Sequence, residues 1–166
     1  LYDVHRRLCA SIEPETGATV MQYDAASNVT WSAAGTSSAD GNRFTDCGLA
    51  RDAAEFSGRR VDRTYDTRNR PLTLSFPDGR GNQSFTYTLD GLPSQVTTNN
   101  SAGGTTVVNG YTYNRRRMLT AETMNQVGWY TWQIGYGYDT LGNLASQSYP
   151  TGLSVGYTPN ALGQAT

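Results

Sequence analysis

The stretch YDTLGNL at residues 138–144 recurs along the chain in weaker copies, and its turn-forming residues indicate the fold class. Asp early in a tight turn accepts hydrogen bonds from backbone N–H groups further on, and Gly at the fifth position tolerates the left-handed backbone that closes a hairpin loop. An apolar residue then restarts the chain. The pattern aromatic–Asp–x–x–Gly–x–apolar therefore predicts a strand, a short turn and a returning strand.

Copies of this pattern follow one another at a spacing near 21 residues. Tyr2 and Tyr23 lie 21 residues apart, and Tyr23 and Tyr65 lie 42 apart, with the aromatic Phe44 at the midpoint. We expect eight units, starting near residues 2, 23, 44, 65, 87, 113, 138 and 157. The residues that define the repeat are Tyr2, Asp3, Tyr23, Asp24, Tyr65, Asp66, Gly91, Tyr113, Tyr138, Asp139 and Gly142.

The position that closes each turn is either Gly or a substitute for it, and an apolar residue follows within about three positions. In the first seven units this closing position is Arg6, Ser27, Gly48, Asn69, Gly91, Arg117 and Gly142.

Between these turns the chain alternates with period two, which is typical of strands and not of helices. Residues 83–89, 109–114 and 133–139 each place aromatic side chains on one face, and second turns fall at 13–17, 76–82, 99–104 and 149–152. We expect an all-β antiparallel meander of at least ten strands with no helix longer than about two turns.

The least regular stretch is 31–58, and no linker divides the chain, so residues 1–166 are expected to form a single domain. Within that stretch we interpret 34–42 and 50–60 as surface loops, with 48–56 either a short helical turn or part of a loop. They would interrupt a degenerate third repeat.

Composition excludes several classes of protein. The chain has 166 residues, 16% of them charged, and a net charge of -1, which argues against a protein made mainly for nucleic acid or anionic membrane. No apolar run approaches the ~18 residues that a membrane span needs. Eighteen Gly and eleven Tyr are typical of turns and strands, and 11% aromatic residues argue against disorder.

In these repeats the sequence resembles the RHS or YD-repeat family, and the resemblance covers essentially the whole chain. It implies a hairpin array that is part of a hollow β-shell. Such shells enclose a toxic C-terminal segment in bacterial polymorphic toxins, type VI secretion effectors and insecticidal toxin complexes, and a related shell serves adhesion in teneurins. The DPxG-rich motif beside which some members cleave themselves is absent from this sequence, so no cleavage residue is carried over.

No residue pattern indicates an enzyme, a metal site or a cofactor. His5 is the single histidine, and with Cys9 and Cys47 it gives too few ligands for zinc. A Cys9–His5 nucleophile is weighed against a solvated turn histidine, and the turn is favoured. The carboxylates fall mostly in turns. The two cysteines lie 38 residues apart, so a regular meander would hold them roughly 15–20 Å apart, and we expect two unbonded thiols.

Two clusters are candidates for binding. Residues 115–117 are three consecutive arginines in a repeat turn, interpreted as a solvated turn or a contact to the parent protein rather than a nucleic-acid site. Tyr130 and Trp132 share a face by alternation, with Trp129 on the other. Such a face suits either core packing or a glycan surface.

The sequence thus predicts a non-catalytic structural segment of an RHS-type shell that encloses or carries a toxin polypeptide, secreted or at the cell surface of a bacterium. The alternative is an extracellular adhesin or carbohydrate-binding module. Expected partners are the remainder of the parent chain and the enclosed C-terminal toxin, with a glycan in the alternative. Because neither end carries a feature that blunts a sheet edge, we also expect self-association through the edges.

Overall fold

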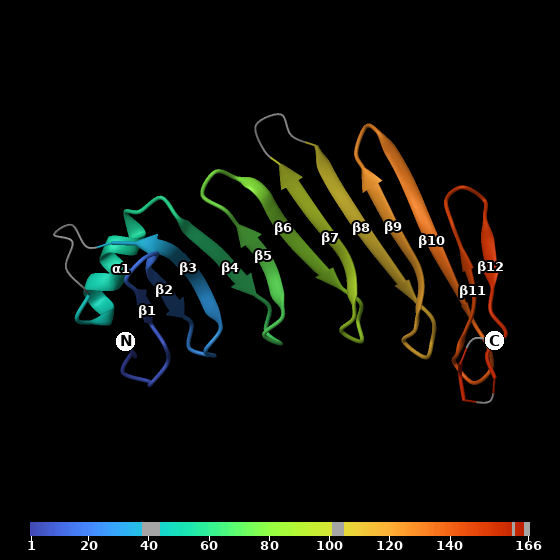
Figure 1. The fold of residues 1–166 in the computed structure, drawn as a ribbon, viewed down its shortest axis with the longest axis horizontal. Coiled ribbons are helices and arrows are strands. Elements are labelled where there is room, and N and C mark those ends of the chain that lie inside the picture. The colour runs from blue at the N-terminus through green and yellow to red at the C-terminus, as the bar shows by residue number, and fades with distance from the viewer. Residues whose placement is uncertain (38–43, 101–104, 161, 165–166) are drawn as a thin grey trace. The chain divides into compact units, whose positions relative to one another are not determined.

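The computed structural model describes residues 1–37, 44–100, 105–160 and 162–164. These residues contain twelve strands, and the order of the strands in the sheet follows the order of the chain (Figure 1). Sequence neighbours pair antiparallel, as in β1 with β2 and β8 with β9. The predicted all-β antiparallel meander of at least ten strands is confirmed.

Where a single domain was expected, the chain divides into two compact units. The first is Leu1–Ser84 with Asn100–Gly104, and the second is Phe85–Asn99 with Thr105–Thr166. The first unit contains β1 (Ala10–Glu13), β2 (Gly17–Tyr23), β3 (Val29–Thr36), α1 (Cys47–Glu55), β4 (Arg60–Tyr65), β5 (Pro71–Ser75) and the start of β6 (Arg80–Tyr87). The second contains the end of β6, most of β7 (Pro93–Asn100), β8 (Thr106–Tyr113), β9 (Leu119–Gln126), β10 (Tyr130–Tyr138), β11 (Leu144–Ser148) and β12 (Ser154–Gly156).

The first unit has a closed apolar core between α1 and the strands β1–β3. Strand register pairs Val20 with both Ala10 and Ala33, so these small side chains lie on one face of the sheet. The helix covers that face with Ala50 and Ala54, which are fully buried. The whole buried set is Cys9, Ala10, Ala18, Val20, Trp31, Ala33, Phe44, Ala50 and Ala54.

The helix corrects two predictions about the irregular stretch. Residues 50–55 are helical where a loop was expected over 50–60, and residues 34–36 belong to β3, while 38–42 lie outside the described residues. At nine residues, α1 also exceeds the expected limit by about half a turn. The physical reason lies in Asp46. Its carboxylate accepts a hydrogen bond from the Leu49 N–H, which is the geometry of a helix N-cap, and an Ala-rich stretch follows.

The unit expected at Phe44 is consequently not a hairpin. Gly48 takes no left-handed conformation, unlike the other six closing positions named from the sequence. β3 pairs directly with β4, with Trp31 opposite Asp62, so the whole segment between these strands leaves the ladder as one insertion. The doubled spacing between Tyr23 and Tyr65 marks this insertion.

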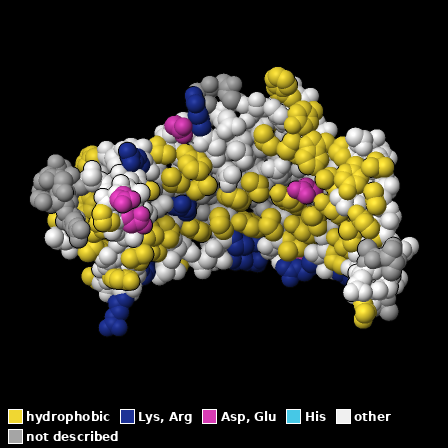
Figure 2. All heavy atoms as spheres, viewed as in Figure 1, with side chains coloured by type: hydrophobic (Ala, Val, Ile, Leu, Met, Phe, Trp, Pro, Cys, Tyr) yellow, Lys and Arg dark blue, Asp and Glu magenta, His cyan; other side chains and the backbone are white. Residues whose placement is uncertain are grey.

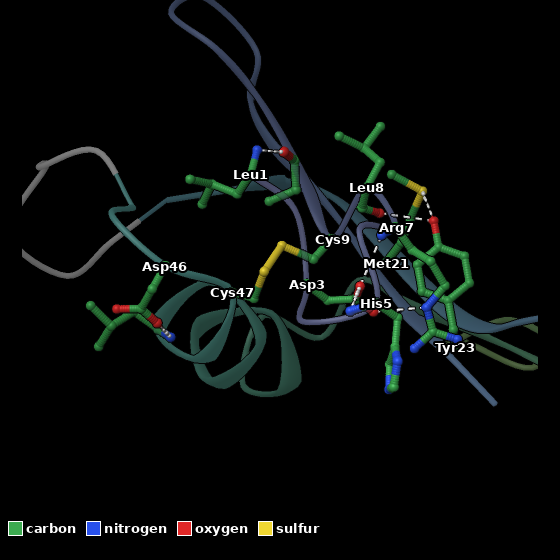
Figure 3. The surroundings of a disulfide bond; sticks show 12 residues. Leu1, Asp3, His5, Arg7, Leu8, Cys9, Met21, Tyr23, Asp46 and Cys47 are labelled. Atoms are coloured by element: carbon green, nitrogen blue, oxygen red, sulfur yellow. Dashed lines mark hydrogen bonds and ion pairs between the residues drawn. A yellow bond between two sulfur atoms is a disulfide. The ribbon is translucent and has the colours of Figure 1, made fainter. Parts of the chain in front are cut away.

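The prediction of two free thiols is wrong, since Cys9 and Cys47 form a disulfide with their Cα atoms 5.8 Å apart. The estimate of 15–20 Å assumed that Cys47 lay four strands away along a regular meander. Cys47 instead begins α1, and the helix folds back onto the first strands. Figure 3 shows the sulfur–sulfur bond joining the start of the helix to the segment that leads into β1.

The sheet of the second unit has two chemically different faces. Met124 of β9 lies opposite Asn109 and Trp132, and the neighbouring row joins Tyr111 to Ile134 through Glu122. The rows between them belong to the other face and consist mainly of Thr, Asn, Gln and Gly, such as Thr123 opposite Gly110. No hydrophobic side chain among the described residues of this unit is fully buried.

Candidate functional site

The repeat turns share one backbone geometry. In the 138–144 copy, the Gly142 N–H donates to the Asp139 carbonyl, and the Asp139 N–H donates to the Asn143 carbonyl. This is a tight turn closed by a bulge. The same pair of bonds recurs in turns that begin at Asp3, Asp24, Asp66, Thr88, Asn114 and Asn160.

The first side chain of each turn organises it from within. Both the Leu141 and the Asn143 N–H groups donate to Oδ1 of Asp139, and the Asn143 side chain donates to Oδ2 at 3.0 Å. In the Asp66 turn, the Arg70 guanidinium replaces the amide, with Nε to Oδ2 at 2.7 Å. Asn114 accepts the equivalent backbone bonds from Arg116 and Met118. An amide oxygen or a hydroxyl can therefore substitute for the carboxylate.

These bonds favour the charged form of the turn carboxylates. The side-chain hydrogen bond from Asn143 lowers the pKa of Asp139, and backbone bonds from the same turn lower it further. The backbone hydrogen bond from Arg70 is the largest cause of the lowered pKa of Asp66. Asp3 and Asp24 are lowered in pKa by equivalent bonds. The titratable groups at the repeat motif are thus held ionised as structural acceptors.

Three repeat tyrosines link their units to the preceding unit in the sheet. The Tyr23 hydroxyl donates to the Leu8 carbonyl, and the Tyr138 hydroxyl donates to the Leu119 carbonyl, both at 2.8 Å. The Tyr65 hydroxyl donates to the Val29 carbonyl at 2.9 Å, across the inserted segment. In these three cases the acceptor is the apolar residue that follows the closing position of the preceding motif. The motif is therefore a device for joining successive hairpins.

The closing residues adopt the left-handed backbone that the sequence predicts. Gly91 and Gly142 have φ of 92° and 94°. Arg6, Ser27, Asn69 and Arg117 do so without being glycine, with φ between 59° and 67°. A non-glycine residue in this region usually costs about 1–2 kcal/mol, so the turn bonds must hold the backbone there.

The last unit starts two residues later than expected. The turn bonds begin at Asn160, where the Gly163 N–H donates to its carbonyl, so Pro159 occupies the place of the repeat tyrosine. Tyr157, the expected start, instead donates its hydroxyl to the Gln147 side chain at 3.3 Å. The aromatic spacing alone gave the wrong register because the residue before this turn is Pro159, which is not aromatic, while Tyr157 lies two positions earlier.

Two of the three consecutive arginines brace neighbouring turns. Arg116 donates to the Thr140 carbonyl at 2.8 Å, and Arg117 donates to the Asp90 carbonyl and lies 3.4 Å from its carboxylate. Arg115 is exposed. The turn at 114–118 is therefore linked to the turns on both sides of it.

The described residues contain no group of three His, Cys, Asp or Glu side chains arranged to hold a metal ion. His5 is exposed, and Figure 3 shows its ring pointing away from the disulfide. Because Cys9 is oxidised, a Cys9–His5 nucleophile does not exist in this structure. A cavity of about 510 Å³ lies beside the disulfide, between the first repeat turn and the start of α1.

The expected aromatic surface is divided between packing and exposure. Register places Tyr130 and Trp132 on the same face of β10, and Tyr130 is 50% exposed while Trp132 is partly buried. Trp129 at the tip of the β9–β10 hairpin is 77% exposed, beside Val127. Figure 2 shows hydrophobic atoms gathered over β9 and β10. The expected surface of Tyr130 and Trp132 stays a prediction, and Trp129 is more exposed than either ring.

Searches for related proteins found likeness in structure but not in sequence. No family model matches the chain. No curated protein matches it either. Among solved structures, 90% of this chain aligns with 9% of a chain in the crystal structure of TcdB2-TccC3-TEV, at 16% identity and a TM-score of 0.45.

Two further structures match over the same share of the chain. The crystal structure of TcdB2-TccC3 matches at 15% identity and a TM-score of 0.45. The structure of the Photorhabdus luminescens Tc holotoxin pore with the TccC3-D651A mutation matches at 14% identity and a TM-score of 0.41. The chain spans about 9% of the length of each of these matched chains.

Proposed function

We propose that the chain is a non-catalytic wall segment of an RHS-type shell that encloses or carries a toxin polypeptide. The observation that carries the proposal is the interlocked repeat turn. Its ionised carboxylates serve as structural acceptors, because backbone and side-chain donors of the same turn occupy their oxygens. The motif residues join successive hairpins into one sheet, and a continuous sheet is what the wall of a shell requires.

The second unit supports the same proposal from its sheet faces. A sheet that is apolar on one face buries that face against another element in a stable domain. The described residues of the unit supply no such layer, although Met124, Trp132 and Ile134 share one face. An enclosed polypeptide with exposed apolar side chains would cover it, as the resemblance to the family implies.

The disulfide supports placement outside the reducing cytoplasm. Disulfides form and persist in secreted, periplasmic or cell-surface proteins. Cys9 and Cys47 are bonded, so we propose that the chain folds in such a compartment and is secreted or displayed on the cell surface. Within the described residues, no helix is long and apolar enough to cross a membrane.

The test is protection of the proposed cargo from protease. The gene region that encodes this chain is expressed together with the coding sequence that follows it, and the product is digested with trypsin under native conditions. A wall segment predicts that the following polypeptide survives while bound and is cleaved at once when expressed alone. Equal rates of cleavage in the two preparations would reject the proposal.

Self-association through the sheet edges remains part of the proposal. At the β1 edge, the Leu1 amino group donates to the Ala10 carbonyl at 2.7 Å, so the first residue already occupies part of that edge. β12 has only three residues and pairs with β11 alone. Light scattering across a dilution series should show association that weakens when Ser154, whose N–H faces the open side of β12, is replaced by Pro. A stable monomer of 18.1 kDa at all concentrations would contradict self-association through the sheet edges.

Glycan binding is a second candidate function, favoured by the exposure of Trp129 and Tyr130 at the β9–β10 hairpin. Exposed rings can stack on the apolar faces of sugars. A glycan array with the intact chain should give signals that Trp129→Ala removes. Leu141→Ala, which trims an equally exposed apolar side chain on another turn, is the matched control.

A further inference from the structure

The disulfide is the one covalent bond between the sheet of the first unit and its helix, and it borders an open cavity. Both Cys9 and Cys47 line the cavity of about 510 Å³. Cys9 is 5% exposed and belongs to the buried core, while Cys47 is partly exposed at the first position of α1. Because Cys47 is the more exposed of the two residues, we expect a thiol that enters the cavity to attack its sulfur first.

Charge at the cavity wall does not reverse this preference. Arg7 and Arg51 line the cavity, and so do the carboxylates of Asp3 and Asp46. Arg7 is already engaged, with its Nε 2.8 Å from Asp3 and its guanidinium over the Tyr23 ring. An approaching thiolate therefore meets cations and anions in equal number, and accessibility decides which sulfur it attacks.

We propose that Cys9–Cys47 is a thiol–disulfide exchange site that opens in the folded protein, with a small thiol or an exposed protein thiol as its substrate. The thiolate attacks Sγ of Cys47, the bond between the two protein sulfurs breaks, and Cys9 leaves as a thiolate that takes a proton from water. A second thiol then attacks the mixed disulfide and releases Cys47. Two thiols are oxidised to one disulfide, and the protein disulfide is reduced to two thiols.

Opening this bond loosens the helix without removing the fold of the strands. The helix otherwise holds to the sheet through the methyl groups of Ala50 and Ala54, with Ala53 packed beside them, and these bury little area. Strand pairing in β1–β5 does not depend on the disulfide. The exchange site is thus a latch on α1, set by oxidation and released by thiols.

Trypsin makes the site of attack measurable. The folded chain is treated with a limiting amount of glutathione, free thiols are blocked in acid, and the product is digested. Cleavage after Arg7, Arg43 and Arg51 separates the two cysteines into peptides 8–43 and 44–51. The glutathione adduct is expected on 44–51, with the blocking group on 8–43. An adduct mainly on 8–43 would overturn the proposed direction of attack.

The rate of opening distinguishes exchange in the folded state from exchange after unfolding. The reduction rate is expected to rise in proportion to glutathione concentration, whereas a rate that levels off at the unfolding rate would overturn the proposal. Amide exchange in α1 is then expected to become about tenfold faster after reduction, and in Cys9→Ser/Cys47→Ser, with β8 and β9 unchanged. Unchanged exchange in α1 would show that the bond is not a latch.

Discussion

The two units differ in what covers the apolar face of their sheet. The first unit covers its sheet with α1, buries Val20 and Trp31, and fixes the helix with a disulfide. The second unit has the same repeat turns but keeps its aromatic side chains half-buried on an uncovered face. The repeat therefore specifies how strands join, and it leaves open what covers them.

This difference separates two sources of stability. Turn hydrogen bonds and tyrosine links are present in both units, while fully buried apolar side chains are found in the first alone among the described residues. Burial contributes roughly 25 cal/mol per Å² of apolar surface, whereas an exposed hydrogen bond contributes much less. Substitutions with matched partners in the two units should reveal the contrast.

The largest expected effect comes from the disulfide. A cross-link between residues separated by 38 positions stabilises by about 4 kcal/mol in the chain-entropy model. Cys9→Ser/Cys47→Ser should therefore lower the urea midpoint of the first unit and leave the second unit unchanged. Trp31 alone reports the first unit when Trp129 and Trp132 are replaced by Phe, and amide exchange in β8 and β9 measures the second unit. An equal shift in both units would show that they unfold as one.

The next largest effect distinguishes buried from half-buried valines. Val20 is 1% exposed and packed on all sides, so Val20→Ala should cost about 2 kcal/mol through lost burial and a cavity. Val107 lies on the uncovered face of β8, and Val107→Ala should cost less than about 1 kcal/mol. Urea unfolding of each variant measures the pair. Equal costs would mean that another layer covers the second unit.

Two glycines at equivalent places in the sequence pattern should respond with opposite sign. Gly142 has φ of 94°, so Gly142→Ala should cost about 1–2 kcal/mol from backbone strain. The new methyl group would have room, since its nearest neighbour is the Met118 sulfur at 3.5 Å. Gly48 is helical, so Ala gains helix propensity, but the new methyl group would lie 3.1 Å from Oδ1 of Asp46, which caps α1. Gly48→Ala should therefore stabilise α1 by less than about 0.5 kcal/mol, and a clear loss of stability would contradict this expectation.

Acid should destabilise the repeat turns, and replacing a turn carboxylate by an amide should reduce this pH dependence. The lowered pKa of Asp139 means that its ionised form stabilises the folded state above the ordinary carboxylate range, and this contribution is lost as pH falls through the lowered value. Asp139→Asn should keep the turn, as Asn114 does in its own unit, but flatten the fall in urea midpoint between about pH 5 and 2. Asp52→Asn, at an exposed ion pair on α1, is the control and should change little.

The smallest effect concerns left-handed arginines. Arg6→Gly removes the strain of a φ of 61° and should stabilise the first unit by about 0.5 kcal/mol after the added chain entropy of glycine. Arg117→Gly removes similar strain but also the bonds to Asp90, so its net effect should be near zero. Thermal unfolding of both variants compares them, and a gain for Arg117→Gly alone would contradict this account.

The turns and strands of this protein follow from residues that are close together in the sequence. The Asp that opens a turn, the left-handed closing residue and the period-two strands could be predicted, since each depends on side chains within about five residues of one another, whereas Asn and Thr in the same role were seen only in the structure. Pattern also placed Tyr130 and Trp132 on one face of a strand, which the register of β10 bears out. These features follow from backbone geometry that neighbours in sequence impose.

The helix at Cys47–Glu55 depends on contacts between residues that are far apart in the sequence. The motif-like start at Phe44 becomes a helix because Asp46 caps it and because Ala50 and Ala54 fit against Val20, a contact between distant parts of the sequence. That fold-back brings Cys47 to Cys9, which spacing along a meander had placed out of reach. Hydrogen bonds within a turn are local, whereas burial and cross-links depend on which segments the whole chain brings together.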